Sequence, residues 1–288
     1  MSVPRIFDMA LRARRRDRAA RNFDAHGFLY EAAAEEMLDR LMDVSRTFRD
    51  ALVIGAPTDM LPIALRARGL TVQVADPGPA FAAARGGVAI SEDEPLPFAP
   101  GSFDLILCCG TLESVNDVPG FLVQLREILR PDGLLLVAFV GAGSLPGLRA
   151  ALLEGDGDRP AQRIHPQIDV RSAGDLLSRA GFAMPVADVQ SLRVGYENMT
   201  GLTTDLRGMG GAQCLASAPP PLTRSALLRA MIRFAEGADP DGRVRERFEI
   251  VHMSGWRPDP SQPKAARRGS ATVSLADALK GGGKTPDA

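Results

Sequence analysis

The segment 97–141 of the chain reads PFAPGSFDLILCCGTLESVNDVPGFLVQLREILRPDGLLLVAFVG. It contains two apolar runs, 103–109 and 134–140, each as long as a strand that is covered on both faces of a sheet. The residues between them, 118–129, carry apolar side chains at helical spacing and charged side chains on the other side. A strand, a helix and a second strand in this order predict a right-handed crossover in a parallel sheet.

The predicted helix ends at the sequence Arg130-Pro131-Asp132-Gly133. Proline cannot continue the hydrogen-bond ladder of a helix, and glycine accepts the backbone angles of a turn. We therefore expect the second strand to begin only at Leu134.

Further strands are predicted on both sides of this unit, at 51–55, 71–75, 88–90, 184–194 and 248–256. Because helical segments separate most of them, the chain is expected to form a doubly wound α/β sheet of seven strands, with helices on both faces. Ligands of such sheets bind beyond the carboxyl ends of the strands. The polar residues that follow the strands are therefore the candidates for a binding site.

The strand and helix pattern predicts a sheet domain over 46–257, with a helical insertion at about 195–240. A helical segment, 1–45, precedes it, and 258–288 is rich in proline and glycine, which predicts a flexible tail. The first 21 residues hold seven arginines and two aspartates. Two interpretations stay open for them: a helix that packs its apolar stripe on the domain with its arginines in solvent, or a basic helix that contacts a membrane surface or an acidic partner.

The composition excludes several classes of protein. A net charge of −1 gives no general argument for nucleic-acid binding. The longest apolar run has seven residues, far short of the roughly 20 that cross a bilayer, and no secretory signal is recognisable after Met1. The three cysteines form no CxxC pair, which favours a reducing compartment such as the cytoplasm. If the basic first helix contacts a membrane, the protein would lie peripherally on the inner membrane.

Four features resemble the class I S-adenosylmethionine-dependent methyltransferases, which have a Rossmann-like seven-stranded sheet. They are VIG at 53–55, Asp76, LPF at 96–98 before SFDLIL, and LRPDGLLLVAF at 129–139. The resemblance implies S-adenosylmethionine as cofactor. It implies that Gly55 lies in the cofactor loop, that Asp76 accepts hydrogen bonds from the ribose, that Glu92 or Asp93 contacts the adenine, and that Cys109 and Gly110 line the methionine part.

The chain departs from that family in the loop after the first strand. Where these methyltransferases carry GxGxG, this chain has Gly55-Ala56-Pro57-Thr58-Asp59. Proline removes an N–H, and threonine and aspartate add bulk and a negative charge where the backbone of the family approaches its ligand. A protein that keeps the fold and has lost the cofactor site therefore stays an alternative.

A narrower resemblance covers nearly the whole chain. IFDMALRARRRDRAA at 6–20, VND at 115–117, RAGF at 179–182, DLRGMG at 205–210 and RGSATVS at 268–274 are similar to the NADH:ubiquinone oxidoreductase complex assembly factor 5 group. This resemblance implies action on an iron–sulfur subunit of respiratory complex I, by methyl transfer or by hydroxylation of an arginine. The alternatives are a methyltransferase of small molecules and a non-catalytic assembly chaperone.

The candidate catalytic groups are few. The three histidines, His26, His165 and His252, lie in separate segments, and no metal site is predicted from them. We expect His252 in the core, and His165 either in an exposed loop or in a substrate cleft. Glu113 is the acid best placed to act on a substrate, although a solvated loop glutamate is its simpler interpretation. Cys108 and Cys109 are interpreted as buried packing.

Overall fold

A seven-stranded sheet forms the centre of the computed structural model, which describes residues 5–55 and 58–262. Its strand order is β3-β2-β1-β4-β5-β7-β6. All neighbouring strands are parallel except for β7, which runs antiparallel to both β5 and β6. The strands are β1 Asp50–Ile54, β2 Thr71–Asp76, β3 Val88–Ala89, β4 Phe103–Cys109, β5 Leu129–Val140, β6 Ala183–Tyr196 and β7 Val244–Trp256. The predicted Rossmann-like α/β fold is confirmed.

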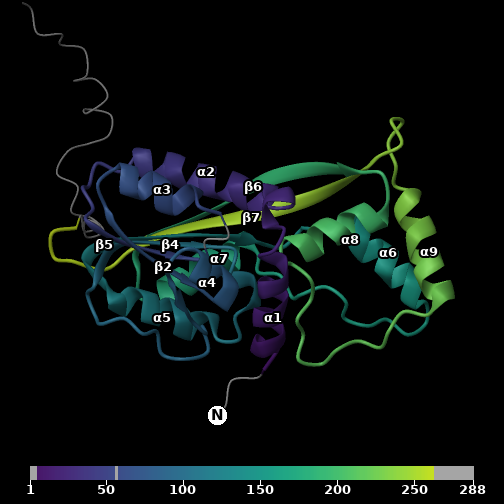
Figure 1. Ribbon diagram of the computed structural model, residues 1–288, viewed down its shortest axis with the longest axis horizontal. Coiled ribbons are helices and arrows are strands. Elements are labelled where there is room, and N and C mark those ends of the chain that lie inside the picture. Colours follow the sequence, from purple (N-terminus) through teal and green to yellow (C-terminus); the bar gives the residue numbers. More distant parts are fainter. Residues whose placement is uncertain (1–4, 56–57, 263–288) are drawn as a thin grey trace, which may run out of the picture. The chain divides into compact units, whose positions relative to one another are not determined.

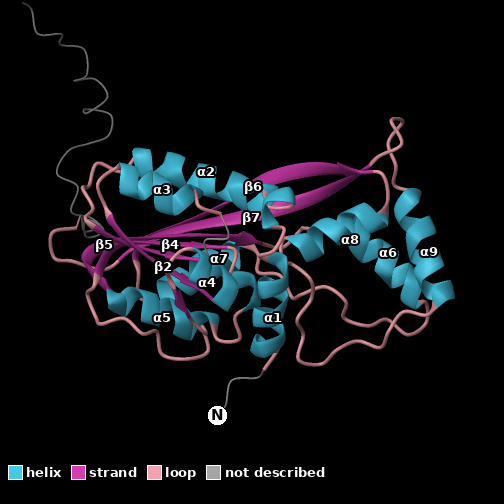
Figure 2. Cartoon of the chain, in the orientation of Figure 1, coloured by secondary structure: helices cyan, strands magenta, loops and turns pink. Residues whose placement is uncertain are grey.

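Helices cover both faces of this sheet (Figures 1 and 2). The α-helices are α1 Met9–Ala19, α2 Phe28–Met42, α3 Met60–Ala67, α4 Pro79–Ala84, α5 Val118–Ile128, α6 Pro146–Asp156, α7 Val170–Arg179, α8 Met199–Gly208 and α9 Arg224–Ala235. Successive residues of a strand point to opposite faces. Accordingly, Val53 and Leu107 belong to the core cluster that contains residues of α2 and α3, whereas Leu52 and Ile106 belong to the cluster with α5 and α7.

The strand β5 begins earlier than the sequence predicts. Leu129 already pairs with Phe103 of β4, and the register then shifts so that Leu134 pairs with Leu105. Asp132 adopts a φ of 59°, which allows the extra residues to bulge out of the ladder. Pro131 ends helix α5 as expected, but the segment after it is an irregular strand and not a free turn.

The helices α6, α8 and α9 lie beside the long β6–β7 pair (Figure 1). Helix α9 packs on α6, and the Thr223 side chain accepts a hydrogen bond from the Ala226 N–H, which caps the start of this helix. Helix α8 ends at Gly208, within the predicted helical insertion at about 195–240. The chain turns there because Gly210 adopts a φ of 77°, which glycine tolerates best.

Helices α1 and α2 belong to the same compact unit as the sheet, Met1–Pro258. Two of the sequence predictions lie outside the described residues: the effect of Ala56 and Pro57 in the loop after β1, and the tail segment 263–288 with its RGSATVS sequence. Among the residues that are described, no helix is both long and apolar enough to span a bilayer.

Candidate functional site

The residues predicted to hold a cofactor meet at the carboxyl ends of β1 to β4. Asp76 is the last residue of β2, and Glu92 follows β3; both are buried, with exposed fractions of 0% and 1%. Gly55 follows β1, and Gly110 follows β4. Because β3, β2, β1 and β4 are neighbours in the sheet, their ends bring these four residues together.

The two remaining predicted residues point elsewhere. Asp93 is exposed, and its Oδ2 accepts a hydrogen bond from Asn116 Nδ2 at 2.7 Å. The Cys109 side chain is 1% exposed and belongs to a core cluster. Of the pair after β3, it is therefore Glu92 that faces the strand ends, and Cys109 would contribute only backbone there.

Two arginines of α1 reach the buried acids. Arg16 donates from Nε to Asp76 Oδ1 at 2.8 Å and from Nη2 to Oδ2 at 2.7 Å. Arg12 donates from Nη1 to Glu92 Oε2 at 2.5 Å and from Nη2 to the carbonyl oxygen of Thr111 at 2.9 Å. Residues four apart share one face of a helix, so one face of α1 presents both guanidinium groups to the sheet.

These arginines overturn the expectation that the first helix keeps its arginines in solvent. Arg12 and Arg16 are each only 4% exposed, whereas Arg14 and Arg18 of the same helix are exposed. Burial by itself would lower the pKa of Arg16, but the Asp76 carboxylate more than compensates and raises it. Arg16 is therefore charged in the folded protein, paired with the acid that the resemblance assigns to the ribose.

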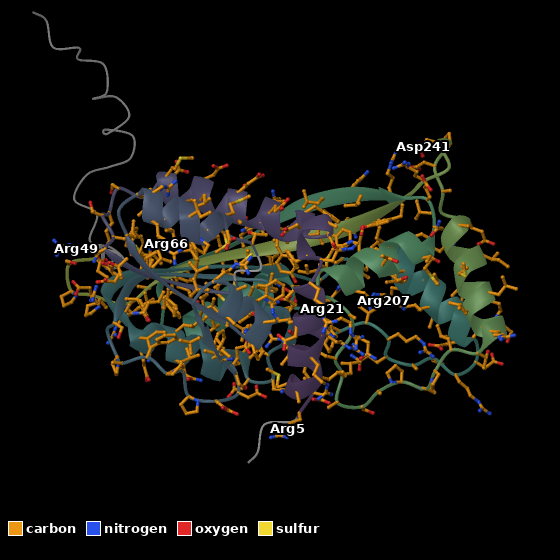
Figure 3. All side chains as sticks on the ribbon, viewed as in Figure 1. Arg5, Arg21, Arg49, Arg66, Arg207 and Asp241 are labelled. Carbon is orange, nitrogen blue, oxygen red and sulfur yellow. The ribbon has the colours of Figure 1, made fainter. Side chains whose placement is uncertain are left out.

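A cavity of about 320 Å³ adjoins the strand ends on the side of α8. Arg12 and Arg16 form part of its wall together with Gly110, and Arg207 of α8, labelled in Figure 3, lies at its border. The other polar residues of its lining include Tyr30, Glu113, Arg163, His165, Gln167, Gln213 and Cys214. The cavity is the candidate substrate site, because it lies directly beside the predicted cofactor residues.

Glu113 lines this cavity from the loop after β4. Its Oε2 atom is buried and has no hydrogen-bond partner among the described residues. Burial raises the pKa of its carboxyl group above the usual value, although Arg12 and Arg16 act in the opposite direction. Glu113 is therefore not a freely solvated loop glutamate but a half-buried acid with one buried, unpartnered oxygen.

Tyr30 of α2 closes the cavity against Gly110. A Cβ atom on Gly110 would lie 1.8 Å from Tyr30 Cε1, and this glycine has a φ of 63°. Burial raises the pKa of the Tyr30 hydroxyl well above its ordinary value. Residue 110 must therefore be glycine for two reasons, the backbone conformation and the close approach of the tyrosine ring.

His165 also lines the cavity, in agreement with the second of its two predicted positions, a substrate cleft, and not with an exposed loop. Its Nε2 accepts a hydrogen bond from the backbone N–H of Cys214 at 2.8 Å, and its ring meets Phe7 edge-on at 5.0 Å. Burial, with Arg12 and Arg15 nearby, lowers its pKa to about 4. The histidine is thus neutral near pH 7, with Nε2 acting as an acceptor.

The other predicted candidates are structural. His252 is 1% exposed in β7, as expected, and approaches Gln190 Oε1 with Nε2 at 3.3 Å. Burial raises the pKa of the Cys108 thiol to about 12 and that of Cys109 further, so neither is a ready nucleophile. Over residues 5–55 and 58–262, no group of three or more His, Cys, Asp and Glu side chains lies close enough to hold a metal ion.

Known proteins share this fold and this sequence. A family model described as a methyltransferase domain matches residues 24–185. Arginine-hydroxylase NDUFAF5, mitochondrial, of Danio rerio is 33% identical over 96% of this chain and 90% of its own. A malonyl-[acyl-carrier protein] O-methyltransferase of Methylovorus sp. is 29% identical over 88% of this chain and 90% of its own. The solved structure of a SAM-dependent methyltransferase from Thermotoga maritima has a TM-score of 0.50 at 17% identity, with 85% and 99% of the two chains covered, and supports the fold alone.

The sheet, the acids at its strand ends and the domain match define this protein as a class I S-adenosylmethionine-dependent methyltransferase, an enzyme of that superfamily. Within the superfamily, the chain belongs to the family of arginine-hydroxylase NDUFAF5. Membership of this superfamily identifies S-adenosylmethionine as the cofactor.

The residues present fit that cofactor in chemistry. Asp76 at the end of β2 is a carboxylate that can accept two bonds from a ribose diol. The Oε1 atom of Glu92 is buried and without a hydrogen-bond partner in the described part of the chain, which suits an amino donor. In this structure, however, both oxygens of Asp76 are bonded to Arg16, so Asp76 would hold the ribose only after a change of partner.

Proposed function

We propose that this enzyme modifies an arginine side chain of a protein, an iron–sulfur subunit of respiratory complex I, with S-adenosylmethionine as cofactor. The observation that carries the proposal is the unpartnered Oε2 of Glu113 in the cavity beside the cofactor acids. A buried carboxylate oxygen without a partner is costly, and an incoming guanidinium supplies the donors that it lacks. The relatives named arginine-hydroxylase support the same class of substrate.

The charges around the cavity favour a cationic substrate over an anionic one. Three of its lining arginines, Arg12, Arg16 and Arg163, are each bonded to a carboxylate, the last to Asp156 at 2.6 Å, while Arg207 lies at the exposed border. Glu113 is the acid of the lining that keeps a free buried oxygen. A carboxylate substrate, as the name of the malonyl-[acyl-carrier protein] O-methyltransferase relative suggests for that enzyme, would face guanidinium groups that are already neutralised beside Glu113.

Bound S-adenosylmethionine supplies a methyl group on a positively charged sulfur. The residues of this chain would do the rest: Asp76 and Glu92 orient the cofactor, and Glu113 aligns the guanidinium and takes the proton that its nitrogen loses when the new N–C bond forms. Tyr30 and His165 form part of the cavity wall around the reacting atoms.

The test incubates the purified protein and S-adenosylmethionine with peptides that span the arginines of the complex I iron–sulfur subunits, and follows the peptide mass. Addition of CH₂ indicates methyl transfer, and addition of oxygen, in a parallel reaction supplied with dioxygen and a reductant, indicates hydroxylation. The matched controls are peptides with lysine in place of arginine, and the Glu113→Gln enzyme, in which we expect the rate to fall roughly 100-fold or more.

The alternatives predict different results. Methylation of a small carboxylic acid or thioester, with every arginine peptide unchanged, would overturn the proposal in favour of a small-molecule methyltransferase. Binding of the iron–sulfur subunit without any modification would favour an assembly chaperone. Peripheral membrane contact through the first helix stays a prediction, which flotation with liposomes tests.

A further inference from the structure

Asp76, the acid predicted to bind the ribose, already accepts hydrogen bonds from the protein on both of its carboxylate oxygens. Asp76 Oδ1 accepts from Arg16 Nε and from the backbone N–H of Gly78 at 2.6 Å, and Oδ2 accepts from Arg16 Nη2. The paired side chains of Arg16 and Asp76 are 5% and 0% exposed. These three hydrogen bonds use most of the roughly four acceptor positions of the carboxylate, and Arg16 covers the fully buried side chain, so a ribose diol cannot form its two bonds to Asp76 while Arg16 stays in place.

Arg16 is held in this position by more than one contact. Its Nη1 donates to the carbonyl oxygen of Gly110 at 3.3 Å, and its guanidinium carbon lies 5.3 Å from the centre of the Phe81 ring. Its guanidinium thus touches both the end of β2 and the residue after β4. These are the two places at which the resemblance locates the ribose and the methionine part of the cofactor.

Helix α1 is docked over the strand ends through a specific set of backbone contacts. Asn116, which follows β4, accepts hydrogen bonds from the N–H groups of Ile6 and Phe7 at 2.8 Å each. Further along, Asp17 accepts the N–H of Ala80, at the start of α4, at 2.8 Å. Both ends of the helix are therefore tied to loops that border the cofactor residues, so the ion pairs are part of a built interface.

We propose that α1 is an internal competitor of the cofactor: Arg16 and Arg12 hold the carboxylates of Asp76 and Glu92, and S-adenosylmethionine binds only in the state in which α1 has released them. Only the small fraction of molecules in the released state can bind the cofactor, and the apparent affinity is lowered in proportion to that fraction. This inference goes beyond the proposed function, since it holds for any substrate. It needs only the cofactor for its test.

The test is calorimetric titration of the full chain with S-adenosylmethionine. Arg16→Met removes the competing guanidinium, and the expected result is an affinity at least about tenfold tighter than that of the wild type. Arg18→Met is the matched control, because it removes an exposed arginine from the same helix and should leave the affinity unchanged. Equal binding by a folded Arg16→Met protein would overturn the proposal, and weaker binding would overturn it and make Arg16 a cofactor ligand.

A second variant covers the possibility that Arg16→Met does not fold, since it leaves Asp76 buried and unpaired. Asn116→Ala loosens the start of α1 and creates no unpaired buried charge, and it too should tighten cofactor binding. In the wild type, saturating S-adenosylmethionine should speed hydrogen exchange of the amides of α1. Unchanged or slower exchange in α1 would contradict the release of the helix.

Discussion

An acid lies at the end of β2 and another in the loop after β4, but their hydrogen bonding differs. Asp76 has both oxygens bonded to Arg16, and one of them also to Gly78, whereas Glu113 keeps one buried oxygen without a partner among the described residues. The same helix explains the difference, because α1 reaches across the acids at β2 and β3 and leaves the cavity beyond them open. In our proposals, Asp76 holds the cofactor and Glu113 holds the substrate.

The sharpest test of this contrast is the stability of two variants. Asp76→Ala leaves the Arg16 guanidinium buried and unpaired, so we expect the free energy of unfolding to fall by about 3–5 kcal/mol. Glu113→Gln removes a buried charge that has an unsatisfied oxygen, and should change stability by less than about 1 kcal/mol. Urea denaturation of the two purified variants measures both values. Similar losses in the two would mean that the acids are equivalent after all.

Gly110 contacts both sides of this comparison. Its carbonyl oxygen accepts a hydrogen bond from Arg16, and its Cα faces the ring of Tyr30 in the cavity wall. Gly110→Ala combines a strained φ with a clash against the ring, and we expect a loss of about 3 kcal/mol. Gly101→Ala is the matched control, because Gly101 has a φ of 65° with nothing within 4 Å of its added Cβ; it should cost about 1 kcal/mol. Equal losses would show that Tyr30 yields to the new side chain.

The smallest expected effect concerns pH and the open cavity. The pKa of His165 is lowered to about 4, chiefly by burial, and its ordinary value in an unfolded chain is about 6.5. The unfolded state therefore binds more protons between these values, so the stability contributed by neutral His165 is present above pH 6.5 and is lost as the pH falls toward 4. Because the side chain is partly exposed, we expect a contribution of roughly 1–2 kcal/mol.

The measurement is urea denaturation of the wild type and of His165→Gln between pH 4 and pH 7. Glutamine can still accept the N–H of Cys214 but cannot take up a proton, so the variant should lose stability less steeply on acidification. A slope remains in both proteins because the pKa of His252 is also lowered to about 4 by burial. Identical slopes would place His165 in contact with water, outside the cavity wall.

The sequence alone determined the sheet, most helix and strand limits, and the positions of Gly55, Asp76, Glu92 and Gly110 at the strand ends. These features follow from local periodicity and from the rule that parallel strands end at one edge. The irregular start of β5 escaped prediction because a bulge depends on the neighbouring strand, β4.

Only the tertiary structure decided the state of the acids. The spacing of Arg12 and Arg16 places them on one face of a helix, but it equally fits arginines in solvent, which is what the basic composition of that segment suggested. Likewise, nothing in the residues around Glu113 distinguishes an exposed loop from a cavity wall. Ion pairs between residues 60 and 80 positions apart, such as Arg16 with Asp76 and Arg12 with Glu92, depend on how distant segments meet, and local sequence does not encode that partner.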